Sequence, residues 1–134
     1  MQEKQETRSE TLENEIKRVK KEMDKLEMFL KNVNLHFDKI EDFHLLLPEE
    51  KFPIIKTIKI GDQISSFYMN GIIRNQIRME IGKTKISVIC HFGSMGYEEG
   101  LLEMWNYDEA EPEGYLTAKQ VIEKIKKIKE KLKN

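Results

Sequence analysis

Basic side chains at alternate positions give the middle of the chain its clearest candidate chemistry. Residues 72–81 and 84–92 alternate apolar and polar side chains on either side of Gly82-Lys83, and glycine first in a two-residue loop predicts a type II′ hairpin. This turn pairs Arg78 with Ser87 and gathers the apolar side chains on the opposite face. The polar face carries the candidate ligand-binding residues Arg74, Arg78, Lys85 and His91.

Two guanidinium groups and an imidazole on a rigid sheet suit an anionic ligand. The arginine fork donates two parallel hydrogen bonds to a phosphate or a carboxylate, so a nucleotide or a phosphate is the small ligand that this face predicts. The next segment, HFGSMGYEEGLLEMW (residues 91–105), can bring Tyr97 over such a ligand. An antiparallel sheet with one solvated face has the same pattern and is the commoner explanation.

A second candidate surface is acidic. Seven carboxylates and no base lie between Gly96 and Gly114, although the whole chain has a net charge of −1. Loop glycines are explained by tight turns, whereas the charged and aromatic residues at a loop tip often carry function. The predicted partner-binding residues are Tyr97, Glu98, Glu99, Glu109 and Glu111. Direct nucleic-acid binding is not expected, because the near-neutral chain lacks a sustained basic stripe.

Residues suited to catalysis or metal binding are few. Cys90 and His91 are neighbours in a predicted strand, so their side chains point to opposite faces and do not form a nucleophile–base pair. His36 and His44 are interpreted as structural, because no second ligand cluster completes a metal shell. We therefore expect a protein that is not an enzyme and that has no metal or cofactor. One cysteine excludes an intrachain disulfide, and without a signal peptide or a membrane-length apolar run we expect a cytoplasmic location.

Apolar residues recur at alternating spacings of four and three from Leu12 to Leu47. This heptad pattern predicts a coiled-coil helix that projects and self-associates in its first part and packs on the globular body in its second. We assign the homodimer interface to Leu12, Ile16, Val19, Met23 and Leu26. Asn34 marks a plausible break, so the expected domains are residues 1–34, the coiled-coil helix, and residues 35–134, the globular part.

Period-two patterns and a capping signal complete the predicted fold. Residues 54–60, 64–69 and 101–107 are expected to be strands in addition to the hairpin. Thr117 followed by Gln120 predicts a capping box at the start of an amphipathic C-terminal helix. The predicted fold class is therefore α+β: a long N-terminal heptad helix, an antiparallel sheet of four or five strands and a C-terminal helix.

The runs SVICHFGSMGYEEGLLEMW and EGYLTAKQVIEKI resemble a pattern in small uncharacterised proteins of phages and mobile elements in low-GC Gram-positive bacteria. The likeness covers roughly residues 86–125 and implies a mobile-element context, where many small proteins bind and block a host protein. Anti-CRISPR and other anti-defence proteins belong to that class, and the host-cell cytoplasm is then the expected location.

Two hypotheses for function follow. The first is a non-enzymatic, oligomeric binding protein that inhibits a host macromolecule, such as a protein of a CRISPR defence complex, through its acidic surface. The alternative is a small-ligand protein that binds or sequesters a nucleotide or phosphate on the sheet face of Arg74, Arg78 and His91.

Overall fold

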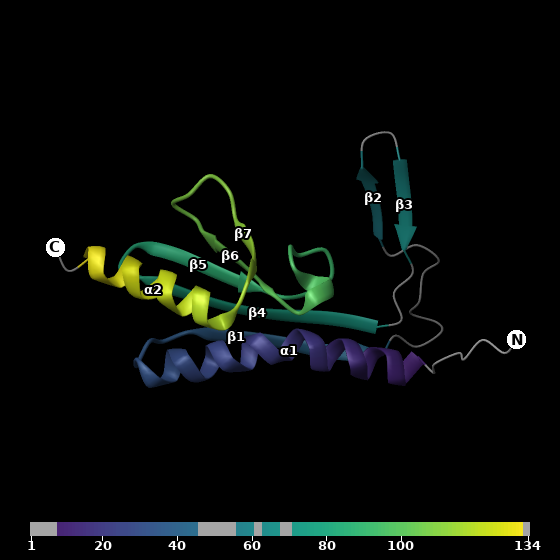
Figure 1. Ribbon diagram of the computed structural model, residues 1–134, viewed down its shortest axis with the longest axis horizontal. Helices are drawn as coiled ribbons and strands as arrows, with labels where there is room; N and C mark the ends of the chain where they lie inside the picture. Colours follow the sequence, from purple (N-terminus) through teal and green to yellow (C-terminus); the bar gives the residue numbers. More distant parts are fainter. Residues whose placement is uncertain (1–7, 46–55, 61–62, 68–70, 133–134) are drawn as a thin grey trace, which may run out of the picture.

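The computed structural model describes residues 8–45, 56–60, 63–67 and 71–132 and has an α+β fold (Figure 1). Its elements are α1 (Arg8–Asn32), β1 (Asp38–Leu45), β2 (Lys56–Ile60), β3 (Gln63–Phe67), β4 (Gly71–Ile81), β5 (Thr84–Ile89), the 3₁₀ helix η1 (Tyr97–Glu99), β6 (Leu102–Asn106), β7 (Glu113–Leu116) and α2 (Ala118–Leu132). The main sheet is antiparallel in the order β1-β4-β5-β6-β7. The α+β class and the two helices of the prediction are confirmed. Within the described residues, no helix is long and apolar enough to cross a membrane.

Both helices lie against one face of the main sheet, and the core fills the space between them and the strands (Figure 1). Ile77, Val88 and Met104 stand opposite one another on three adjacent strands and are buried. The polar side chains alternate with these residues and therefore point to the other face. We call that second face, which no helix of the described residues covers, the open face.

The predicted hairpin and capping box are confirmed. β4 and β5 pair in the predicted register, with Ile81 opposite Thr84, and Gly82 has the positive φ of 63° that the first position of a type II′ turn requires. At the start of α2, the Gln120 backbone N–H donates to the Thr117 hydroxyl at 3.2 Å, while the Gln120 amide oxygen accepts from the Thr117 N–H at 2.9 Å.

The helix predicted between residues 35 and 47 is wrong, because residues 38–45 form strand β1. α1 ends in a Schellman motif around Asn34, which has a left-handed φ of 58°: the Leu35 N–H donates to the Leu30 carbonyl at 3.1 Å. The chain then pairs along β4 in eight consecutive positions. This tertiary pairing overrides the local heptad pattern, whose member Ile40 is a β-branched residue that strands also favour. Leu47 lies outside the described residues.

The predicted homodimer seam is also corrected. Val19, Met23 and Leu26 are 0% exposed and belong to the core that α1 shares with the sheet. Ile16 packs against the same core, and the Leu12 side chain lies outside the described residues. A narrow apolar stripe can face a sheet as well as a partner helix, and here the sheet covers it. The predicted domain boundary after residue 34 therefore separates two parts of a common hydrophobic core.

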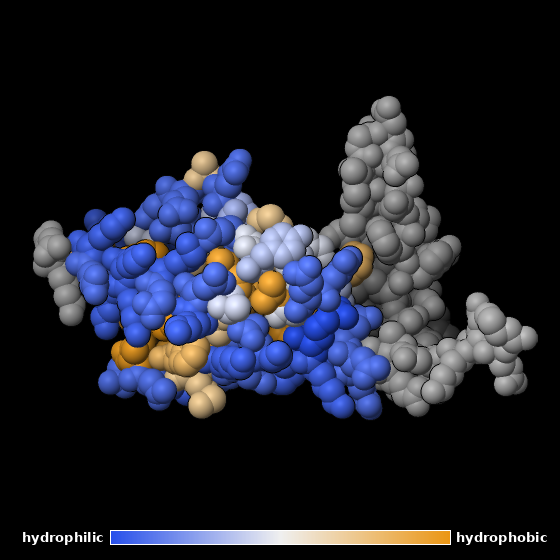
Figure 2. Space-filling view, in the orientation of Figure 1, coloured by the Kyte–Doolittle hydropathy of each residue, from blue (hydrophilic) through white to orange (hydrophobic). Residues whose placement is uncertain are grey.

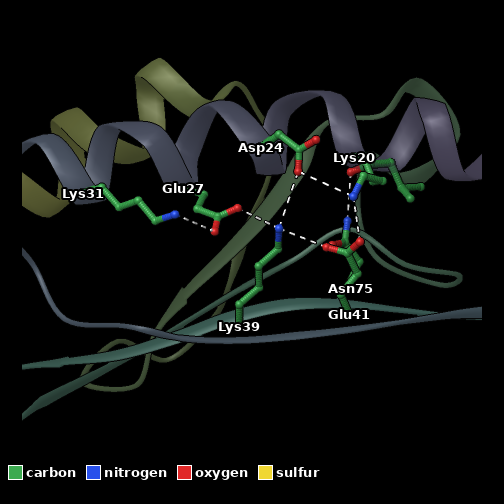
Figure 3. Close-up of polar contacts among 8 residues, drawn as sticks. Lys20, Asp24, Glu27, Lys31, Lys39, Glu41 and Asn75 are labelled. Carbon is green, nitrogen blue, oxygen red and sulfur yellow. Dashed lines mark hydrogen bonds and ion pairs between the residues drawn. The ribbon is translucent and has the colours of Figure 1, made fainter.

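Charged side chains fasten α1 to the edge strand β1 (Figure 3). Lys39, on β1, contacts the carboxylates of Glu27 at 2.7 Å, Glu41 at 2.9 Å and Asp24 at 3.5 Å. Lys20 reaches Glu41 at 2.6 Å from the helix side. Charges that point inward from an edge strand disfavour pairing with another chain, so these contacts hold the helix and also protect the sheet edge.

The membership of the main sheet differs from the prediction. β2 and β3 lie where strands were expected but pair with each other in a separate two-stranded sheet; residues 54–55 and 68–69 of those predictions lie outside the described residues. β7 was not predicted and forms the other edge of the main sheet. It contains a bulge, because Met104 pairs with Glu113 but Leu102 pairs with Leu116. The bulge contains Tyr115, which has a left-handed φ of 58°.

Candidate functional site

The open face collects side chains from four adjacent strands. Asp38 stands opposite Arg78, Arg78 opposite Ser87, and Ser87 opposite Trp105. The next row continues from Glu80 to Lys85, and Tyr107 follows because its N–H donates to the Lys85 carbonyl at 3.0 Å. Basic, acidic and aromatic side chains therefore lie within two neighbouring rows of one rigid surface.

A concavity of about 490 Å³ lies at this end of the open face. It is lined by His36, Asp38, Arg78, Met79, Glu80, Lys85, Ile86 and Tyr107. Two of the four predicted anion-binding residues, Arg78 and Lys85, thus share a space whose volume falls in the range of small-molecule sites. The sheet fixes both backbones, so the two cations can reach one ligand without a rearrangement of the strands.

The other predicted ligand residues are placed elsewhere. Arg74 is exposed on the open face, four residues along β4 from Arg78, and does not line the concavity. His91 follows the end of β5 and is half-buried, and its backbone N–H and carbonyl both bond the Ser94 hydroxyl. The structure therefore brings Arg78 and Lys85 together, whereas Arg74 lies apart from them and His91 belongs to a turn.

Trp105 and Tyr107 were missed as site residues. Their ring centroids lie 4.7 Å apart with a tilt of 54°, and 39% and 49% of these residues are exposed. The Trp105 indole N–H donates to the Glu109 carbonyl at 3.2 Å, which fixes the ring. The alternation in LLEMWNY contained the signal, because strand residues two apart share a face and Leu102 and Met104 belong to the core.

The open face carries balanced charge. Its cations Arg74, Arg78 and Lys85 are accompanied by the carboxylates Asp38, Asp42, Glu80 and Glu103. Within the concavity, Arg78 and Lys85 stand beside Asp38 and Glu80. Such a site attracts a ligand with one anionic group and several hydrogen-bond donors better than it attracts a polyanion.

Tyr97 was predicted both to cover the ligand and to bind a partner, and both assignments are wrong. It is 9% exposed and lies under α1, on the helix side of the sheet. Its hydroxyl donates to the Glu15 carboxylate at 2.5 Å, and the Arg18 guanidinium lies 4.8 Å from its ring. Burial, followed by the bond to Glu15, raises the pKa of the Tyr97 hydroxyl. Tyr97 therefore anchors the loop to α1.

The glycines around Tyr97 serve the same packing. A Cβ on Gly100 would lie 2.6 Å from the Arg18 carbonyl oxygen, and Gly100 has a φ of 72°. A Cβ on Gly114 would lie 2.2 Å from the Cβ of Met95, which connects the loop to β7. The glycine and tyrosine pattern of this loop thus has an architectural reason.

The predicted acidic surface divides into two parts. Glu98 and Glu99 are exposed on η1, while Glu109 and Glu111 are exposed in the β6–β7 connection. η1 precedes β6 and the connection follows it, so the pairs lie at opposite ends of that strand (Figure 1). Three further acids hold the fold: Glu103 accepts from the Met95 N–H, Asp108 accepts from the Thr84 hydroxyl, and Glu113 pairs with Lys124 at 2.7 Å.

Metal-binding and cysteine chemistry are limited in the described part of the chain. Among the described residues, no group of three or more His, Cys, Asp or Glu side chains is arranged to hold a metal ion. Cys90 is fully buried, and burial raises the pKa of its thiol to about 11 against an opposing effect of Arg18. Comparisons with protein-family models, curated proteins and solved structures found no match.

Proposed function

We propose that the protein is a non-enzymatic binding protein that holds a small phosphate-bearing ligand on the open face. The observation that carries the proposal is the concavity of about 490 Å³ into which Arg78 and Lys85 converge. Arg78 supplies a planar fork for two phosphate oxygens, and Lys85 supplies a point charge. Asp38 and Glu80 can accept hydrogen bonds from hydroxyl or amino groups elsewhere on the same ligand.

Calorimetric titration tests this proposal with nucleoside monophosphates and sugar phosphates as probes. Arg78→Ala and Lys85→Ala should each weaken binding about tenfold or more, because each removes a hydrogen bond to a charged group. Arg74→Ala is the matched control, since Arg74 is exposed on the same strand and face but outside the concavity. Equal loss in all three variants, or no binding by the native chain, would reject the proposal.

A second candidate function is the inhibition of a host defence macromolecule, such as a protein of a CRISPR complex, by a phage or mobile-element protein acting in the host cytoplasm. It is supported by the exposure of Glu98, Glu99, Glu109 and Glu111, while neighbouring acids are used in internal contacts. Because these glutamates form two pairs at the ends of β6, the partner would bind along that strand. An exposed carboxylate pair at each end would set the orientation of a basic partner.

Exchange of the four glutamates for glutamine should then reduce capture of the host partner in a pull-down from the native host. The control is the double variant Glu123→Gln and Glu130→Gln, which neutralises exposed acids on α2. Undiminished capture by the fourfold variant would reject the acidic contact. A homodimer also remains part of this proposal, with an interface outside the buried α1 seam.

A further inference from the structure

We propose that the open-face site recognises an aromatic base in addition to a phosphate, so that its ligand is a free nucleotide whose base stacks on Trp105 and Tyr107. This inference rests on the proposed function, because it assigns the second half of the same ligand. It extends the site beyond the residues that line the concavity to Trp105, the only tryptophan of the chain.

Arg78 and Trp105 lie in one row of the open face, on either side of Ser87. Ser87 stands between them on the central strand; it is 7% exposed, and its hydroxyl accepts a hydrogen bond from the Gln76 amide at 2.8 Å. Adjacent strands are about 4.8 Å apart, so Arg78 and Trp105 flank Ser87 at a separation of about 10 Å. A guanidinium and an indole that flank a small side chain on one sheet face can both stack against a planar base.

The aromatic rings are held in place before a ligand arrives. The Trp105 indole is fixed by its bond to the Glu109 carbonyl and by the Tyr107 ring, yet both side chains remain substantially exposed. Side chains of this size usually contribute to a protein through burial. Two of them side by side on a polar sheet face, next to a cavity, favour a ring-bearing ligand over a simple phosphate.

The balance of charge selects a free nucleotide over a nucleic-acid strand. Arg78 and Lys85 can neutralise a single phosphate group, but Asp38 stands opposite Arg78, Glu80 stands opposite Lys85, and Asp42 follows opposite Arg74. Successive phosphates of a strand would meet these carboxylates, whereas a mononucleotide can offer its ribose hydroxyl and base amino groups to them.

Trp105 fluorescence tests the inference directly, because the indole is both the reporter and the proposed stacking surface. The probes are the four ribonucleoside 5′-monophosphates, ribose 5-phosphate, inorganic phosphate and short single-stranded oligonucleotides. We expect at least one monophosphate to quench Trp105 and to bind about tenfold or more tightly than ribose 5-phosphate, the increment that one aromatic stack supplies. Calorimetry then compares Trp105→Leu and Tyr107→Leu with Tyr115→Leu, a control tyrosine that is 59% exposed outside the site.

Loss of the nucleotide preference in Trp105→Leu or Tyr107→Leu, with Tyr115→Leu unchanged, supports the inference. If Trp105→Leu does not fold, the Tyr107 variant alone decides the outcome. Equal binding of ribose 5-phosphate and nucleotides overturns the role of the base and leaves the phosphate site intact. Tighter binding of oligonucleotides than of mononucleotides overturns the free-nucleotide assignment. If no probe binds, both this inference and the phosphate site are rejected.

Discussion

At the residue scale, backbone strain at Tyr115 and burial of Cys90 should have measurable effects on the free energy of unfolding. Tyr115 adopts a left-handed φ of 58° in the β7 bulge, although the residue is 59% exposed and gains little from packing. A residue with a Cβ in that conformation costs about 1 kcal/mol, and glycine does not incur this cost. The strain accompanies the bulge that brings Gly114 against Met95.

Tyr115→Gly should therefore raise the free energy of unfolding by about 0.5 kcal/mol, because relieved strain contributes about 1 kcal/mol and the greater entropy of glycine in the unfolded chain takes back about half of it. Denaturant unfolding followed by circular dichroism measures the change. Tyr115→Ala is the control, because it removes the ring but keeps the Cβ. Equal stability of the two variants would show that the ring, and not the backbone, sets the energy at this position.

The buried thiol of Cys90 predicts a loss of stability in alkaline solution. Burial raises its pKa from 9.0 to about 11, so the unfolded chain releases this proton at a lower pH than the native chain. The native state keeps its full advantage below pH 9 and loses it as the pH rises from about 9 to 11. Urea unfolding at pH 7, 9 and 10.5 should show the decline.

Cys90→Ala should remove the thiol's share of that alkaline decline, at the cost of a lower stability at neutral pH. The remaining decline belongs in part to Tyr97, whose pKa is raised by burial and by Glu15 and which therefore acts in the same direction at higher pH. The native thiol should also resist alkylation until the protein unfolds. An unchanged pH profile in the alanine variant would contradict the assignment.

At the scale of elements, the contact between α1 and β1 depends on Lys39. Burial by itself would lower the pKa of Lys39, but hydrogen bonds with Glu27 and Glu41 reverse this effect and raise it. The bond from Lys39 lowers the pKa of Glu27. Burial acts to raise that of Glu41, yet its bonds with Lys20 and Lys39 lower it overall. The carboxylates thus stabilise the fold in their charged form.

Lys39→Met should reduce the free energy of unfolding at pH 7 by about 1–2 kcal/mol, since several partly buried ion pairs are lost together. The contribution of the lowered carboxylate pKa values is present above pH 4.5 and disappears as the pH falls below it. The native chain and the variant should therefore become similar in stability near pH 3. Lys31→Met is the control, because Lys31 is 66% exposed and contacts Glu27 from the surface; a loss as large as that of Lys39→Met would contradict this account.

Some elements could be predicted from the sequence because their signals are local. Gly82 fixes the β4–β5 register, and the Thr117–Gln120 pair fixes the start of α2. β1 could not be predicted in this way, since it forms along the free edge of β4, which no local pattern reveals. Glu22 shows the same limit: from α1 its carboxylate accepts the Ala118 N–H of α2 at 2.8 Å across 96 residues.

Residues of the candidate site could likewise be predicted only where the sequence signal was local. Arg78 and Lys85 were found because the hairpin register is local, but Tyr97 was misplaced because its contact with Glu15 spans 82 residues. Trp105 was overlooked although strand alternation places it opposite the core residues Leu102 and Met104. Local periodicity therefore predicted which side chains share the open face. Only the tertiary fold showed that Tyr97 anchors a loop to α1 and does not lie on that face.

At the scale of the whole molecule, the two faces of the main sheet differ: the helices pack on one face, and the open face carries the candidate site. α1 and α2 cover the core, and Figure 2 shows their outer surface as largely hydrophilic with a small apolar patch near the C-terminal end of α1. Met28, near that end, is 63% exposed, whereas Met23 on the same helix is fully buried. The heptad seam of α1 thus packs against the sheet of its own chain, so any assembly of several chains must involve other surfaces.

The packing of the α1 seam against the sheet can be tested with one type of substitution at two positions of the helix, Met23→Ala and Met28→Ala. Met23→Ala should lower the free energy of unfolding by about 2–4 kcal/mol, because it leaves a cavity between α1 and the sheet, whereas Met28→Ala should change it by less than about 0.5 kcal/mol. Sedimentation of the folded variants should show the assembly state of the native chain in both cases. A Met23 variant that stays fully stable but dissociates from a dimer would instead place this side chain between two copies, and α1 would then have to leave the sheet.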